Sequence, residues 1–325
     1  MWPSDAARTV AAMRVLVAVG GNAMTAPDGS ARPEDQIDAV RRAAEPIAGL
    51  VAAGHEVLLT HGNGPQVGNL LVKNELAAAV VPPVPLDWCV AQTQATIGFI
   101  LVNALERALA ARGLRTPVAT VVTRTLVAGD DPGFADPAKP IGRYLPEAEA
   151  RSMIDHGQTW QDRGARGWRR VVASPEPEQI LDAPAVHALA SAGFVVVASG
   201  GGGIPVVREQ DGSIRGVEAV IDKDLAAAVL GAAVNADVLV IATDVEAAVL
   251  GFGTAVAKPI GATTPTELRR HAVEFEGGSM RPKVEAVCRF VEAGGQRGVI
   301  TSLERIFDGA AGRAGTVVKR ESADA

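Results

Sequence analysis

Short apolar runs alternate with longer helical segments along most of the chain, and this alternation constrains the fold more than any other feature. Each run is apolar throughout, as in a parallel strand buried on both faces. The runs span 15–19, 56–60, 116–122, 194–198, 238–242 and 298–301, and the predicted helices span 33–53, 65–79, 87–112, 225–234 and 280–293. We therefore predict an α/β fold with a mainly parallel sheet and helices on both faces.

One stretch, residues 124–177, breaks the alternation. It is rich in Pro, Gly, Asp and Arg, and Tyr144, Trp160 and Trp168 are scattered through it. It is much longer than an ordinary connection between elements, which indicates a functional segment. A disordered insertion is the alternative interpretation. The aromatic residues favour a small folded excursion instead.

Length and charge exclude several classes of protein. The 325 residues suffice for one large domain or two lobes, and the net charge of −6 offers no basic field for nucleic acid. Two cysteines without a zinc-like Cys/His spacing are typical of a reducing compartment. We see no apolar run near the roughly 18 residues that a membrane helix needs, and no apolar signal core near Asp5 and Arg8. We expect a soluble cytoplasmic protein without nucleic-acid or membrane partners.

Three glycine-rich loops follow predicted strands. They are Gly20-Gly21-Asn22, then His61-Gly62-Asn63-Gly64-Pro65, and then Ser199-Gly200-Gly201-Gly202-Gly203. Glycine lets backbone N–H groups approach an anion closely, and open α/β sheets bind ligands at the carboxyl ends of their strands. None of the loops has the P-loop or the dinucleotide-binding pattern. Together they predict an anion site at that edge of the sheet.

Lysines at helix starts are the second signal. Lys223 lies between Asp222 and Asp224, and Lys283 follows Pro282, both near the start of a predicted helix. A cation is disfavoured at a helix N-terminus, so a bound anion is its natural partner; a solvated surface lysine is the alternative. Phosphoryl transfer needs positive charge around the transferred group, and these lysines would supply it.

Carboxylates and other groups complete the prediction. Asp224 could hold the lysines in place, whereas Asp222 could simply cap the helix. His61 could act as a general base, or its loop geometry alone could explain it. Cys89 and Cys288 are predicted to lie in the core. The remaining Asp clusters read as solvated turns, so no metal-ligating residues are predicted.

The chain resembles the carbamate kinases of the amino acid kinase family from residue 14 to residue 318. The resemblance rests on motifs spread over that range: Val17-Ala18-Val19-Gly20-Gly21-Asn22-Ala23, His61 to Gly68, Pro137-Ala138-Lys139-Pro140-Ile141-Gly142, Trp168 to Val172, Gly200 to Pro205, Gly216 to Asp224, Thr243-Asp244-Val245, Gly278-Ser279-Met280 and Ile300 to Glu304. Together these motifs are highly specific.

The resemblance implies a three-layer αβα sandwich with a protruding lid. It implies an N-terminal lobe, 14–205, that binds carbamoyl phosphate and carries the lid excursion 124–177. A C-terminal lobe, 206–318, would bind ATP or ADP. It further implies a homodimer and a reversible, Mg²⁺-dependent transfer between carbamoyl phosphate and ADP, with Mg²⁺ bound together with the nucleotide.

The resemblance also assigns residues. Lys139 matches the lid lysine that reaches the transferred phosphate, Lys223 and Lys283 match the other two phosphate lysines, and Asp224 matches the organising aspartate. The expected substrate side is Gly20, Gly21, Asn22, Gly62, Asn63, Gly64, Gly200 and Gly201, and the expected nucleotide side is Thr243, Asp244, Val245, Gly278 and Met280.

Two departures fall near the expected nucleotide pocket. Arg281 stands where the family usually has glycine, and Leu250 stands near a position that is more often aromatic. Two alternatives therefore stay open. One is a kinase of the same fold that acts on another small acid. The other is a nucleotide-sensing homologue that has lost catalysis.

Overall fold

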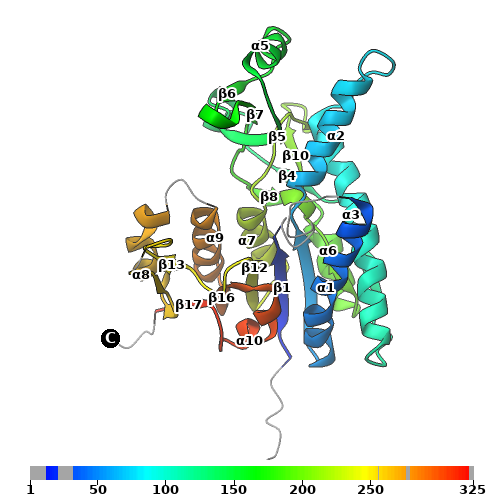
Figure 1. Cartoon of the computed structure of the whole chain (residues 1–325). Coiled ribbons are helices and arrows are strands. Elements are labelled where there is room, and N and C mark those ends of the chain that lie inside the picture. Colours follow the sequence, from blue (N-terminus) through cyan, green and yellow to red (C-terminus); the bar gives the residue numbers. More distant parts are fainter. Residues whose placement is uncertain (1–11, 21–31, 255, 276–278, 322–325) are drawn as a thin grey trace, which may run out of the picture.

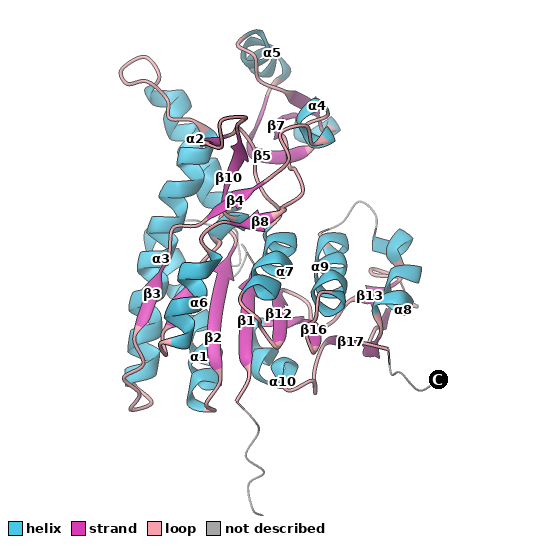
Figure 2. Cartoon of the chain, turned by 180° about the vertical axis from the view of Figure 1, so that it is seen from behind, coloured by secondary structure: helices cyan, strands magenta, loops and turns pink. Residues whose placement is uncertain are grey.

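The computed structural model describes residues 12–20, 32–254, 256–275 and 279–321, and within them the dominant feature is an eight-stranded sheet (Figures 1 and 2). Its neighbouring strands are parallel except for the β16–β17 pair. In order across the sheet the strands are β15 (Ala262–Thr263), β17 (Thr316–Lys319), β16 (Arg297–Ser302), β12 (Val238–Thr243), β1 (Arg14–Val19), β2 (Glu56–His61), β9 (Val195–Val197) and β3 (Val118–Thr120). The mainly parallel sheet is as predicted.

Alternate residues of the central strand face two separate hydrophobic cores. In β1, Val15 and Val17 pack in one core with α1 (Pro33–Ala52), α3 (Leu86–Ala110) and α10 (Ile306–Ala310). Leu16 and Ala18 pack in the other with α6 (Ala183–Ser191), α7 (Lys223–Ala233) and α9 (Met280–Glu292). Side chains of a strand point alternately to opposite faces, so each face carries its own helical layer. The predicted three-layer αβα sandwich is confirmed.

A second, smaller sheet lies at the carboxyl edge of the main one. Its strands are β11 (Ile214–Gly216), β10 (Ile204–Arg208), β4 (Arg124–Leu126) and β8 (Gln179–Ile180), in that order. The start of the predicted excursion, at residue 124, therefore forms part of this sheet. The chain leaves the sandwich only after β4.

The protruding part of the excursion is a three-stranded sheet with its own small core. It comprises β5 (Lys139–Leu145), β7 (Trp168–Val172) and β6 (Trp160–Asp162), with α5 (Glu147–Asp155) packed on them. Leu145, Ala150 and Trp160 form its core. We call residues 139–172 the lid, because they project over the carboxyl ends of the main strands in both views (Figures 1 and 2). The excursion is folded, as its aromatic residues predicted.

The remaining elements are short or lie beside the lid. They are α2 (Gly64–Ala77), α4 (Pro132–Ala135), α8 (Pro265–Arg270), β13 (Val249–Leu250), β14 (Lys258–Pro259), and the 3-10 turns Gly164–Arg166, Gly200–Gly202, Ala272–Phe275 and Leu303–Arg305. The two-residue strands were not predicted, because two residues show no periodicity.

Helix α3 is the longest apolar helix in the described part of the chain. By length and composition alone it is apolar enough to cross a membrane, although no such segment was predicted. Half of its most apolar window is buried inside the protein, where Ile97 and Leu101 pack against the sheet. The helix therefore reads as a core helix whose opposite face remains open.

Candidate active site

A cavity of about 350 Å³ lies where the lid meets the carboxyl edge of the main sheet. It is bounded by the loop after β2, the first turns of α2, α7 and α9, and strand β5 of the lid. Its lining includes Gly62, Asn63, Gly64, Pro65, Lys139, Pro140, Ile141, Gly201, Val220, Ile221, Asp222, Lys223, Asp224, Ser279, Pro282 and Lys283. All four predicted catalytic residues, Lys139, Lys223, Asp224 and Lys283, are thus brought together.

Asp224 holds two of the lysines from the body of the fold. Its side chain is buried, one carboxylate oxygen accepts a hydrogen bond from Lys223 Nζ, and Oδ2 accepts one from Lys283 Nζ at 2.9 Å. Burial alone would raise the pKa of the Asp224 carboxyl. The two ammonium groups outweigh that effect and keep its pKa below the ordinary value of 3.8. The ionised trio carries one net positive charge next to the cavity.

Local sequence explains why Lys223 and Asp224 start a helix. Asp222 is the N-cap of α7, and its Oδ1 accepts hydrogen bonds from the backbone N–H groups of Asp224 (3.0 Å) and Leu225 (3.4 Å). The capping role considered for Asp222 is therefore confirmed. The helix begins two residues before the predicted start, and this places both charged side chains in its first turn.

Asp222 also contacts the lid. Its Oδ2 accepts a hydrogen bond from Lys139 Nζ at 3.0 Å. Lys139 opens β5 of the lid, and 40% of its side chain is exposed. One carboxylate thus joins the helix cap to the lid lysine. This contact could not be predicted from local sequence, because the two residues lie 83 positions apart.

Two glycine loops pack directly on each other beside the cavity. A Cβ at Gly200 would lie 2.3 Å from His61 Nε2, and one at Gly201, where φ is +66°, would lie 2.1 Å from Asn63 Nδ2. Only glycine fits either position. Gly201 lines the cavity together with Gly62, Asn63 and Gly64, whereas Gly200 is a spacing residue behind them.

Buried polar side chains of α3 support these loops, and the sequence analysis did not identify them as part of the site. Gln94 donates to the carbonyls of Thr123 and Gly200 at 3.1 Å each, and Thr93 Oγ1 accepts from Asn63 Nδ2 at 2.9 Å. Buried polar groups need such partners. Adjacent polar residues on the buried face of an apolar helix were the available signal.

His61 and the cysteines take the structural roles that were considered for them. His61 is buried against Gly200, and burial lowers its pKa to about 4, so it is neutral at pH 7. It does not line the cavity. Burial raises the pKa of the Cys288 thiol to about 12 and also raises that of Cys89. Neither thiol is exposed.

The residues predicted for the nucleotide lie along the same edge but outside this cavity. Thr243 ends β12 and donates to Asp244 Oδ1 at 3.0 Å, Val245 follows, and Met280 begins α9. Gly20 follows β1 and donates its N–H to Ala242 O at 3.1 Å. Gly21, Asn22 and Gly278 lie outside the described residues.

In the described part of the chain, no group of three or more His, Cys, Asp or Glu side chains is placed to bind a metal ion. Asp222 and Asp224 are the carboxylates that line the cavity, and both are paired with lysines. This donor set suits an ion held mainly by substrate phosphates and water, as Mg²⁺ commonly is.

Comparisons with known proteins agree with this geometry. The amino acid kinase family profile matches residues 13–302. A carbamate kinase of Thermococcus kodakarensis is 45% identical over 314 residues, which cover 95% of this chain and 99% of that protein. A carbamate kinase-like protein of Escherichia coli is 43% identical and covers 94% and 98%. The solved carbamate kinase of Giardia lamblia bound to AMP-PNP has a TM-score of 0.90 at 36% identity, with 96% and 99% covered. The chain therefore belongs to the amino acid kinase family and, within it, to the carbamate kinases.

Proposed function

We propose that the protein catalyses reversible phosphoryl transfer between carbamoyl phosphate and ADP. The bond from the phosphorus to the carbamoyl oxygen breaks, and a bond to the β-phosphate oxygen of ADP forms. The products are ATP and carbamate, which breaks down to ammonia and CO₂. The observation that carries the proposal is the convergence of Lys139, Lys223 and Lys283 on one cavity. Fixed positive charge around a transferring phosphoryl group is the main requirement of this chemistry.

The two carboxylates give the lysines different parts in the reaction. Lys223 and Lys283 are fixed on helices by Asp224, so they stabilise the phosphoryl group without rearranging. Lys139 is carried by the lid and has to leave Asp222 to reach a substrate phosphate. Charge from Lys139 is therefore supplied when substrate is present and the lid is closed over it.

The loops divide the site between the substrates. We assign carbamoyl phosphate to the lobe 14–205 and its loops, with Gly20, Gly62, Asn63, Gly64 and Gly201 in contact. The nucleotide is assigned to the lobe 206–318, with Thr243, Asp244, Val245 and Met280 nearby. Support comes from their common place at the carboxyl edge of the sheet, where open α/β folds bind ligands.

Mg²⁺ is proposed to accompany the nucleotide. When bound, it would neutralise the charge that develops on the phosphate oxygens. Asp224 would face it through water rather than bind it directly, because both of its oxygens already accept hydrogen bonds from lysines.

A homodimer in the cytoplasm is the proposed state of the protein, and helix α3 offers its surface. Trp88 and Phe99 lie eleven residues, about three turns, apart on one face of α3, and their exposures are 60% and 63%. Val122, just beyond the edge strand β3, is 53% exposed. Light scattering should give twice the chain mass of 33.4 kDa, and Phe99→Glu should give the monomer. A monomeric parent protein would contradict this part.

The activity is tested by ATP formation from ADP with purified protein. Carbamoyl phosphate should support rapid synthesis, and acetyl phosphate should support far less. Lys223→Ala should abolish most of the signal, whereas Lys319→Ala, an exposed lysine on β17, should not. Equal rates with both phosphates would favour a kinase for another small acid, and no ATP from either would favour a homologue that has lost catalysis.

A further inference from the structure

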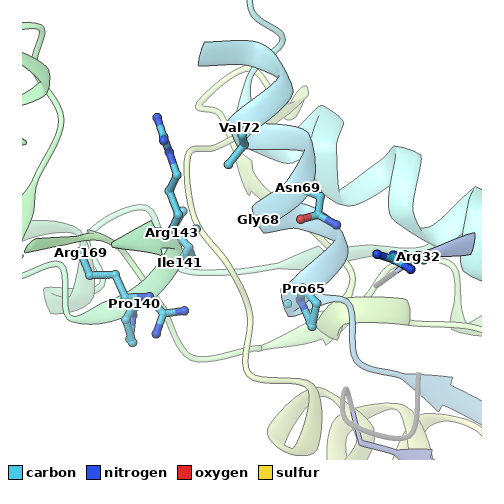
Figure 3. A pocket seen from close by; sticks show the side chains of 11 residues that line it. Arg32, Pro65, Gly68, Asn69, Val72, Pro140, Ile141, Arg143 and Arg169 are labelled. Atoms are coloured by element: carbon cyan, nitrogen blue, oxygen red, sulfur yellow. The ribbon is translucent and has the colours of Figure 1, made fainter. Parts of the chain in front are cut away.

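A second, larger cavity lies between the lid and helix α2, and no step of the proposed reaction takes place in it. Its volume is about 630 Å³, and it is formed by the first turns of α2, strand β5 of the lid, and two further arginines (Figure 3). Its lining residues are Arg32, Gly64, Pro65, Gly68, Asn69, Val72, Pro140, Ile141, Gly142, Arg143 and Arg169. We call it the arginine pocket.

Every ionisable side chain among these lining residues is an arginine. Figure 3 shows Arg143 and Arg169 on the lid side of α2, and Arg32 on the other side with Asn69 between. Arg143 is paired with Glu75 at 3.3 Å. For Arg32, no carboxylate partner is found among the residues that the structure describes. The pocket thus carries positive charge that the described protein does not neutralise.

Arg169, which lines the pocket, has a hydrogen-bond donor without a partner. Its Nε is buried and has no hydrogen-bond partner. Its guanidinium lies 5.0 Å from the centre of the Tyr144 ring, and Nη1 is 3.4 Å from the Tyr144 hydroxyl, a long contact. A buried donor without a partner is costly, and an anionic acceptor would satisfy it. Stacking on Tyr144 holds the planar group ready.

The arginine pocket shares a wall with the cavity of about 350 Å³ that the three lysines line, which we call the transfer cavity. Gly64 and Pro65 of α2 and Pro140 and Ile141 of the lid line both of them. Helix α2 spans 14 residues and has no acidic side chain in its first turn, so the positive end of its dipole is left uncompensated between the two cavities. An anion held in the pocket is therefore separated from the transfer cavity and its lysines only by this shared wall.

We propose that the arginine pocket is an anion-binding vestibule that captures carbamoyl phosphate before it reaches the transfer cavity. This inference rests on the proposed function, because it takes that reaction's anionic substrate as the ligand. Clefts lined by one sign of charge raise the local concentration of an oppositely charged substrate. Salt screens this attraction, and at 0.1 M the screening length is about 10 Å. The overall charge of −6 disfavours the approach of a dianion, and a local positive surface would offset that effect.

The test compares matched arginine variants at two salt concentrations. We expect Arg32→Gln and Arg169→Gln each to lower kcat/KM for carbamoyl phosphate by about three- to tenfold at low salt. The loss should shrink to within about twofold at 0.5 M salt, where charges are screened beyond a few ångströms. kcat and the KM for ADP should not change. Arg42→Gln on α1 and Arg163→Gln on the lid remove the same charge outside the pocket and should have no effect.

Two further variants guard against a loss caused by misfolding. Arg169→Lys keeps the charge and should retain most of the capture. Glu75→Gln frees Arg143 and should change kcat/KM in the opposite direction, raising it at low salt by about twofold. Equal losses in the pocket and control variants, or losses that salt does not reduce, would overturn the proposal.

Binding of inorganic pyrophosphate separates this proposal from the proposed function. Calorimetry on the intact protein should show pyrophosphate binding that is weakened in Arg32→Gln and Arg169→Gln but not in Arg42→Gln or Arg163→Gln. If the protein makes no ATP from carbamoyl phosphate, the proposed function fails while this result still reports on the pocket. If pyrophosphate binds without any contribution from Arg32 and Arg169, the vestibule is ruled out. If it depends on them but does not compete with carbamoyl phosphate, the pocket binds an effector, and the capture role is wrong.

Discussion

The two aspartates of the site hold their lysines in contrasting ways. Asp224 binds Lys223 and Lys283, whose side chains are 14% and 11% exposed, and all three belong to helices packed on the main sheet. Asp222 binds Lys139, which is 40% exposed and belongs to the lid. The first arrangement is a fixed part of the body. The second is a contact between the lid and the body.

The hydrophobic cores that support the two sets of lysines also differ, and the core under the fixed lysines is the larger. Helices α7 and α9 pack into the large core that includes Leu230 and Phe290. The lid depends on its own small cluster around Leu145, Ala150 and Trp160. Segments with few buried apolar contacts open at low free-energy cost. We therefore propose that the site combines charge that is always in place with charge that is delivered on closure of the lid.

Removing the charge of Asp224 should have the largest effect on the protein. Asp224→Asn leaves the buried Lys283 and the largely buried Lys223 without a counter-ion, and breaking a buried pair commonly costs about 3–5 kcal/mol of unfolding free energy. Chemical denaturation measures it, and Asp130→Asn in an exposed turn is the control. An unfolding free energy within about 1 kcal/mol of that of the parent protein, the size of a surface ion pair, would contradict the fixed trio.

The difference in unfolding free energy between the parent protein and Asp224→Asn should depend on pH, and its sign follows from the pKa of Asp224. The folded-state pKa of Asp224 lies below 3.8, so its stabilisation is fully present above that value and is lost as pH falls through the folded pKa. The parent protein and Asp224→Asn should therefore converge in stability as the solution is made more acidic than pH 3.8. A difference that persists unchanged down to the acid limit would show that the carboxylate is not ionised in the folded state.

Lys283→Ala should have the next largest effect, and it should appear in turnover. Removing one preorganised donor from a developing charge commonly costs about 10²–10³ in kcat. The KM for ADP should change little, because the contact strengthens in the transition state. Lys319→Ala is the matched control. Normal turnover with a raised KM for ADP would instead assign Lys283 to ground-state binding.

Asp222→Asn should have the smallest effect and should be confined to the lid. Asparagine caps helices as well as aspartate, so α7 should keep its start while Lys139 loses its partner. A partly exposed ion pair is worth at most about 1 kcal/mol, so amide exchange in 139–172 should speed up by about fivefold or less. Asp222→Ala should add a loss of about 1 kcal/mol in unfolding free energy through the cap. Unchanged lid exchange in Asp222→Asn would remove the contrast between the two aspartates.

Local patterns predicted much of this site, and long-range contacts account for what was missed. Lys223 and Asp224 were found because a charged pair at a helix start is visible within a few residues. The Asp222–Lys139 contact joins positions 83 apart, and Arg169 faces α2 only because the lid folds back over it. The surroundings of α3 also needed the structure, because apolar content does not reveal whether a helix is covered by a sheet or by lipid. Gly21, Asn22 and Gly278 remain predictions, as they lie outside the described residues.

The central claim is that the fixed and the delivered lysines act on one phosphoryl group, and a double-mutant cycle in kcat tests it most directly. Arginine's larger planar fork aims its donors differently, so Lys139→Arg and Lys223→Arg should each lose most activity while the protein stays folded. Combined, the two losses should be clearly smaller than the product of the single effects, because both lysines serve one group. Full activity in Lys139→Arg, or losses that multiply strictly in the double variant, would contradict the account.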